Sequence, residues 1–211
     1  EDWTEKKMTN WFYYLGKIIT GFIFRIWFHI EFHGQENQPQ DRGYILCCNH
    51  RSALDPVLIA QKIKKPIRYM AKMELFQNPF VGFIIRHLGA FPVARGKGDT
   101  SAIDTAVETV KSGRVLGLFP EGTRSHDDQL LRFKSGAAVI ASQSGGDLLP
   151  AAIWYEGKKF RSRVVIRYGK PIANSQILIE ENSTKQIKVV VALLRDEVEK
   201  LLEETRSCEL K

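Results

Sequence analysis

Hydrophobic and polar positions follow two periods along this chain, and together they predict strands interleaved with helices. Single-residue alternation over 28–33 and short apolar runs further on predict strands, whereas apolar residues spaced three and four apart predict helices. We expect strands at 28–33, 44–48, 67–71, 91–94, 115–119, 149–154 and 164–168. We expect helices at 56–63, 101–111, 135–143 and 185–204, with 76–88 helical or looped.

This alternation predicts an α/β fold with a largely parallel central sheet flanked by helices. The sequence has no low-complexity linker and no internal repeat between residues 28 and 211. We therefore expect residues 28–211 to form a single α/β domain, preceded by an N-terminal element at 1–27.

The segment from Asn10 to Trp27 combines many large apolar residues with a polar arc. At 100° per residue, the arc contains Asn10, Tyr13, Tyr14, Lys17, Thr20, Gly21 and Arg25. A helix of this length measures about 25 Å, which is short for a membrane span that carries two cations. We expect an amphipathic helix that lies in the membrane interface. An ordinary helix packed on the domain core is the alternative.

The charge of the chain favours an anionic partner. The 211 residues carry a formal net charge of +7, with a pI near 9.3. Nucleic acid, an anionic membrane or an acidic protein would all fit this charge. The three cysteines and five histidines show no disulfide framework and no metal-ligand spacing, so we expect no metal site.

Candidate chemistry begins where the apolar run 44–48 ends. Pro56 is suited to the first turn of a helix, so His50 lies at the end of a strand and Asp55 at the start of a helix. A carboxylate five residues after a histidine can fold back and accept from one ring nitrogen, which leaves the other nitrogen as a base. Alone this spacing is a weak signal, because Asp before Pro is also a good helix N-cap.

A second polar segment follows another predicted strand. Residues 119–125 read FPEGTRS and come directly after the apolar run 115–118. Parallel strands present their carboxyl ends at one edge of a sheet. We therefore expect both polar segments to line one crevice.

Four blocks of residues occur together in the order that is typical of one enzyme family. They are NHRSALD at 49–55, KMELF at 72–76 followed by Pro79 and Gly82, GAFPVARG at 89–96, and FPEGTRS at 119–125. In this combination the chain resembles the PlsC family, the 1-acylglycerol-3-phosphate O-acyltransferases, within the wider glycerolipid acyltransferase group. The family's next block is matched only loosely, by LLPAAI at 148–153.

The resemblance implies transfer of a fatty acyl chain from a thioester, acyl-ACP or acyl-CoA, to the free hydroxyl of lysophosphatidic acid, giving phosphatidic acid in phospholipid biosynthesis. His50 would take the proton from that hydroxyl, and Asp55 would orient the imidazole and stabilise its protonated form. An ordinary imidazole titrates near pH 6.5, and a positioned base accelerates a reaction by roughly 10²- to 10⁴-fold. No covalent acyl-enzyme is required, and we expect no cofactor beyond the thioester co-substrate.

The phosphate of the acceptor calls for cations and for free backbone N–H groups. Arg124 is the best candidate, with Gly122 allowing close backbone approach and Thr123 adding a hydroxyl. Two further cations that follow predicted strands are Lys72 and Arg95. Glu121 would repel phosphate, so we expect it to orient an arginine or to bind the glycerol of the acceptor.

Other functions remain open at this point. An enzyme of the same group could use glycerol 3-phosphate or another lysolipid, and a non-catalytic lipid-transfer or membrane-binding protein could share the fold. A nucleic-acid-binding module is disfavoured, because the aromatic residues concentrate in the N-terminal segment instead of interleaving with Lys and Arg. We expect attachment to an anionic phospholipid surface on the cytoplasmic face, monotopic through the N-terminal helix, and no nucleic-acid partner.

Overall fold

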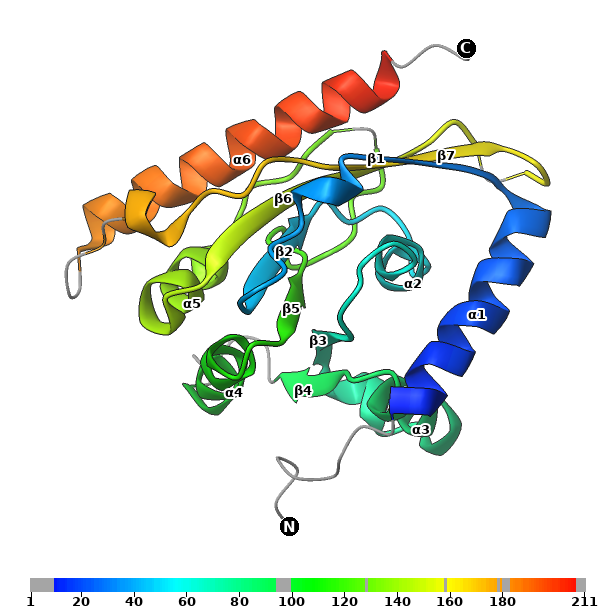
Figure 1. Ribbon diagram of the computed structural model, residues 1–211, viewed down its shortest axis with the longest axis horizontal. Helices are drawn as coiled ribbons and strands as arrows, with labels where there is room; N and C mark the ends of the chain where they lie inside the picture. Colours follow the sequence, from blue (N-terminus) through cyan, green and yellow to red (C-terminus); the bar gives the residue numbers. More distant parts are fainter. Residues whose placement is uncertain are drawn as a thin grey trace.

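The structure is a computed structural model in which helices flank a central sheet (Figure 1). It describes residues 10–93, 100–127, 129–157, 159–177, 179 and 183–207. The strands are β1 (His29–His33), β2 (Tyr44–Cys48), β3 (Ile67–Lys72), β4 (Phe91–Val93), β5 (Val115–Leu118), β6 (Asp147–Tyr155) and β7 (Arg163–Tyr168). The α-helices are α1 (Asn10–Trp27), α2 (Asp55–Ala60), α3 (Pro79–His87), α4 (Thr100–Lys111), α5 (Gly136–Ser144) and α6 (Thr184–Arg206). Short 3₁₀ helices are η1 (Gln35–Asn37), η2 (Met73–Phe76) and η3 (Asn174–Gln176).

Within the described residues, the strands form one sheet in the order β1-β7-β6-β2-β5-β3-β4. Neighbouring strands are parallel except for β6 and β7, which are antiparallel. This confirms the predicted mixed α/β fold with a largely parallel sheet. Because β6, β2, β5 and β3 run in one direction, their carboxyl ends lie at the same edge of the sheet.

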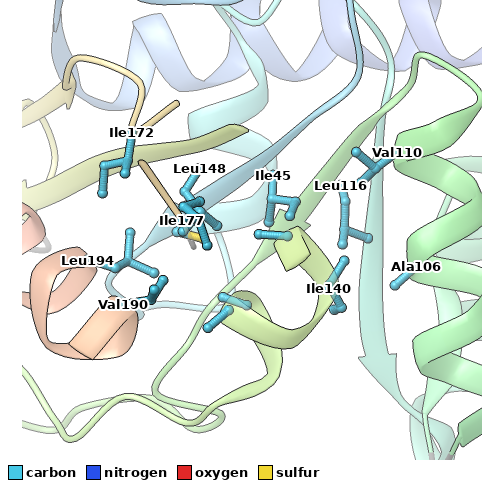
Figure 2. Close-up of a cluster of buried hydrophobic side chains, with 14 of the residues drawn as sticks. Ile45, Ala106, Val110, Leu116, Ile140, Leu148, Ile172, Ile177, Val190 and Leu194 are labelled. Atoms are coloured by element: carbon cyan, nitrogen blue, oxygen red, sulfur yellow. The ribbon is translucent and has the colours of Figure 1, made fainter. Parts of the chain in front are cut away.

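Strand β2 is apolar throughout because both faces of the sheet are covered. Ile45 and Cys47 pack into the cluster shown in Figure 2, with Leu116 of β5 and side chains from α4, α5 and α6. Tyr44, Leu46 and Cys48 point to the opposite face, where they pack with residues of α2. A strand buried on both faces has no polar side to alternate with, which explains the continuous run in the sequence.

Two boundaries depend on local chemistry that hydrophobic periodicity does not register. Helix α3 begins after Asn78, whose side-chain oxygen accepts hydrogen bonds from the N–H groups of Phe80 and Val81 at 3.1 and 3.0 Å. Strand β6 begins at Asp147, two residues before the predicted start. The 3₁₀ turn η2, which follows β3, was not predicted as a separate element.

Gly117 of β5 provides a test of how tightly the sheet is packed. A Cβ at this position would lie 2.2 Å from Cε1 of Tyr69 and 2.8 Å from Cγ2 of Ile67. We expect Gly117→Ala to lower the free energy of unfolding by about 1–3 kcal/mol, the usual cost of overpacking a core, as measured by urea denaturation. Gly136→Ala is the control, since its Cβ would meet nothing within 4 Å. Equal stability of the two variants would contradict this account.

Candidate active site

The turn that follows β2 is anchored to β6 by Asn49. Its side-chain amide donates to the carbonyl oxygen of Ile153 at 3.0 Å, and its side-chain oxygen accepts from the N–H of Ile153 at 2.8 Å. Asn49 is 2% exposed. The pair of hydrogen bonds fixes the start of the turn at the carboxyl edge of the sheet.

His50 and Asp55 meet across this turn as the sequence predicts. Nδ1 of His50 lies 2.8 Å from Oδ2 of Asp55, and the Asp55 side chain is fully buried. With Asp55 ionised, Nδ1 carries a proton and donates it to the carboxylate. The His50 side chain keeps 18% exposure, and its Nε2 has no hydrogen-bond partner among the residues that the structure describes. The imidazole is therefore oriented on one side and open to an acceptor hydroxyl on the other.

The Asp55 carboxylate receives further donors from the turn and from β6. The N–H groups of Arg51 and Ser52 donate to Oδ2 at 2.6 and 2.8 Å. The hydroxyl of Tyr155 donates to Oδ1 at 2.5 Å. A buried carboxylate is costly unless hydrogen bonds replace its hydration. These donors take the place of the water that the buried carboxylate of Asp55 gives up.

The flat face of the His50 ring is supported by an aromatic stack. The ring of Phe119 lies 4.1 Å from the imidazole, centroid to centroid, with an interplanar angle of 22°. Tyr69 stacks behind Phe119 at 6.1 Å and 10°. The FPEGTRS segment therefore begins with a residue that restrains the orientation of the imidazole.

Both carboxylate oxygens of Glu121 accept backbone N–H groups, and among the described residues no arginine donates to it. Oε1 accepts the N–H of His50 at 2.6 Å and Oε2 accepts the N–H of Leu131 at 3.0 Å. The residue is 3% exposed, and burial raises the pKa of its carboxyl although both N–H groups act to lower it. Glu121 therefore has a structural role: it joins the turn at residues 49–55 to the segment that follows FPEGTRS.

The tripeptide Gly122–Arg124 lies between two contacts with the turn at residues 49–55. Glu121 bonds the N–H of His50 on one side, and the N–H of Ser125 donates to the carbonyl oxygen of His50 at 2.8 Å on the other. Gly122 has a φ of 71°, which favours glycine, and a Cβ there would lie 2.7 Å from Nζ of Lys134. Thr123 and Arg124 are exposed. The structure thus brings this tripeptide beside His50.

The remaining predicted cations are placed only in part. Lys72 ends β3 at the same edge of the sheet and forms an ion pair with Glu74 at 2.9 Å, with both side chains about half exposed. Arg95 lies outside the described residues. Among those residues, no group of three or more His, Cys, Asp and Glu side chains is suited to hold a metal ion.

Sequence reasoning missed Tyr155 as a member of the site. It lies 100 residues from Asp55 in the sequence and ends β6, as His50 follows the end of β2. The shared edge of parallel strands was the available signal, but strand order was needed to use it. The nearest strand to β2 on that side is β6.

Comparisons with known proteins agree with this arrangement. Residues 29–154 match the family described as Acyltransferase. The chain is similar to a 1-acyl-sn-glycerol-3-phosphate acyltransferase of Bacillus subtilis, with 36% identity over 68% of this chain and 73% of the relative. A Streptococcus pneumoniae protein of the same name is 34% identical over 92% of this chain and 74% of its own. The crystal structure of the 1-acyl-sn-glycerophosphate acyltransferase PlsC from Thermotoga maritima superposes with a TM-score of 0.74 at 27% identity, covering 96% of this chain and 81% of that one.

Glu121→Gln tests the structural task of Glu121. An amide offers one oxygen where the carboxylate has two, so one backbone N–H loses its acceptor, and we expect a loss of about 1–3 kcal/mol in the free energy of unfolding. Burial raises the pKa of the Glu121 carboxyl in the folded state above the ordinary value of 4.5. Between 4.5 and this raised pKa the folded wild type binds more protons than the unfolded chain, so its free energy of unfolding falls as pH rises. The difference between wild type and variant should therefore shrink as pH rises from 4.5.

Chemical denaturation at a series of pH values measures this difference. Glu108→Gln, on the exposed side of α4, is the control and should leave stability unchanged. A Glu121→Gln protein as stable as the wild type, or a difference that grows with pH, would contradict the assignment.

Proposed function

Since the chain belongs to the Acyltransferase family, we propose that it transfers a fatty acyl chain from a thioester to the free hydroxyl of lysophosphatidic acid, giving phosphatidic acid. The relatives named 1-acyl-sn-glycerol-3-phosphate acyltransferase support this activity. The observation that carries it is the His50–Asp55 pair, with an oriented and partly exposed imidazole.

His50 acts as the general base. Nε2 takes the proton of the acceptor hydroxyl as the oxygen attacks the carbonyl carbon of the thioester, and a C–O bond forms. Collapse of the tetrahedral intermediate breaks the C–S bond, and the protonated imidazole returns the proton to the departing thiolate. Asp55 stabilises the imidazolium between these steps. The enzyme ends the cycle unchanged, with no acyl group attached to it.

The acceptor phosphate binds beside the turn. Arg124 supplies a guanidinium next to His50, and Thr123 and Gly122 contribute a hydroxyl and an accessible backbone. Lys72 supplies a second positive charge from the end of β3, and Arg95 a third. The thioester is acyl-ACP or acyl-CoA, and both are anionic partners for a chain of net charge +7.

Helix α1 binds the membrane interface. Its polar side faces the domain: Nζ of Lys17 donates to the carbonyl oxygen of Ile63 at 2.6 Å, and Thr20 accepts from the amide of Gln61 at 3.1 Å. Its large apolar residues point outward, with Ile18 69% and Phe22 68% exposed. This is the reverse of a helix packed on a soluble core, whose apolar side faces inward. A lipid interface is the environment that suits the outward face.

Helix α3 extends this membrane surface. In Figure 1 the first turns of α1 lie next to α3, and the ring of His87 contacts Phe12 at 5.2 Å and Phe83 at 4.1 Å. Phe80 is 73% exposed on the same helix. Among the described residues, no helix combines the length and apolarity that crossing a bilayer requires. We propose that attachment is monotopic, on the cytoplasmic face, through α1 together with α3.

His50→Ala tests the function. Removing the base should lower kcat for transfer from acyl-CoA or acyl-ACP to lysophosphatidic acid by roughly 10²- to 10⁴-fold. The control is His29→Ala on the edge strand β1, which β7 and β6 separate from β2, and the side chain of His29 is 54% exposed. Retained transfer in His50→Ala would remove the proposed base, and absence of transfer by the wild type to lysophosphatidic acid would remove the proposed acceptor.

Ile18→Ser combined with Phe22→Ser tests the membrane surface. Replacing these two side chains, which are 69% and 68% exposed, should weaken binding to anionic phospholipid vesicles at least tenfold in a sedimentation assay, because apolar burial drives interfacial insertion. Val189→Ser combined with Leu193→Ser also replaces two exposed apolar side chains, 62% and 40% exposed, but on α6, and it should bind vesicles like the wild type. Equal binding by both double variants would exclude α1 as the anchor.

A further inference from the structure

The partly buried side chain of Tyr155 directs its hydroxyl at the Asp55 carboxylate from a different strand of the sheet. It donates to Oδ1 of Asp55, whereas His50, Arg51 and Ser52 all share Oδ2. Among the described residues, Tyr155 is the only hydrogen-bond donor to Oδ1. The two oxygens of Asp55 are therefore held by different parts of the fold.

We propose that Tyr155 is a positioning residue for acyl transfer, which holds the plane of the Asp55 carboxylate so that Oδ2 stays aligned with Nδ1 of His50. The proposal rests on the proposed function of the His50–Asp55 pair. A carboxylate fixed through one oxygen can rotate about its Cβ–Cγ bond. A donor at the second oxygen removes that freedom, and the imidazole then keeps one orientation.

The ring of Tyr155 is itself restrained. It ends β6, where its backbone pairs with Val164 of β7, and the ring packs edge-on against Phe28 at 6.3 Å. Phe28 is 4% exposed and packs against Phe24 of α1 at 6.5 Å. The hydroxyl therefore reaches Asp55 from a side chain with little freedom to move.

Tyr155 remains a donor under all working conditions. Burial, and then the charge and hydrogen bond of Asp55, raise the pKa of its phenol far above the ordinary value. The other titratable groups close to Asp55 are His50, Cys48, Tyr69 and Glu121. Among the described residues none of these donates to Oδ1, and the Ser52 hydroxyl hydrogen-bonds the phenol itself.

Tyr155→Phe is the test, with Tyr168→Phe as the matched control. Tyr168 is equally aromatic and 1% exposed, and its hydroxyl donates to the carbonyl oxygen of Ile59 at 2.6 Å, away from Asp55. Both variants lose one buried hydroxyl hydrogen bond, so both should lose similar stability. Only Tyr155→Phe should lower kcat, by about tenfold, because only this variant removes the hydrogen bond to the Asp55 carboxylate. KM for lysophosphatidic acid should stay unchanged.

A second readout does not depend on turnover. The hydrogen-bonded proton on Nδ1 of His50 should be sharp by ¹H NMR in the wild type and in Tyr168→Phe, and broadened or lost in Tyr155→Phe. If Tyr155→Phe fails to fold, Phe28→Leu, which loosens the ring and keeps the hydroxyl, should show a smaller loss of kcat in the same direction.

The possible results distinguish the positioning role of Tyr155 from the proposed function. Equal kcat in Tyr155→Phe and Tyr168→Phe, or an unchanged Nδ1 proton signal, would overturn the positioning role. Retained transfer in His50→Ala would instead remove the proposed base, and absence of transfer by the wild type would overturn the proposed function. In both cases the NMR comparison would still decide whether Tyr155 controls the alignment of Asp55 with His50.

Discussion

The Asp55 carboxylate is the constraint on which the site depends. It is fully buried, and a buried charge is tolerated only where hydrogen bonds replace water. Its donors come from the turn after β2 and from the end of β6, so both must be in place before the charge is satisfied. The His50–Asp55 pair is thereby coupled to the formation of the central sheet, and an oriented imidazole is a consequence of the folded state.

Glu121 repeats this arrangement one strand away. Its two oxygens accept backbone N–H groups from His50 and Leu131, so a second buried carboxylate joins the catalytic turn to the loop after β5. Phe119 then supports the imidazole ring, and Ser125 closes the far side. Glu121 and Ser125 thus fix the position of the proposed phosphate-binding tripeptide relative to His50, and Arg124 within it is exposed.

The sequence predicted what local pattern controls and missed what strand order controls. The helix at 10–27, the strands and the meeting of His50 with Asp55 follow from periodicities and from a spacing of five residues. Tyr155 and Glu121 reach their partners across 100 and 71 residues, distances over which no pattern in one sequence reports a contact. The chemistry of Glu121 as an acceptor was foreseen, but its partners were not, because backbone N–H groups carry no sequence signature.

The outward-facing apolar side of α1 and the catalytic pair are linked through a short path in the chain. Trp27 ends the helix and is half exposed, whereas the next residue, Phe28, is buried against Tyr155. One peptide bond therefore separates the surface proposed to contact lipid from Phe28, the ring that packs against Tyr155. The polar arc of α1 bonds the backbone of residue 63 and the side chain of Gln61, directly after α2, the helix that begins at Asp55. Because α1 is fixed both to the segment after α2 and, through Phe28, to Tyr155, its orientation also fixes the direction in which His50 faces.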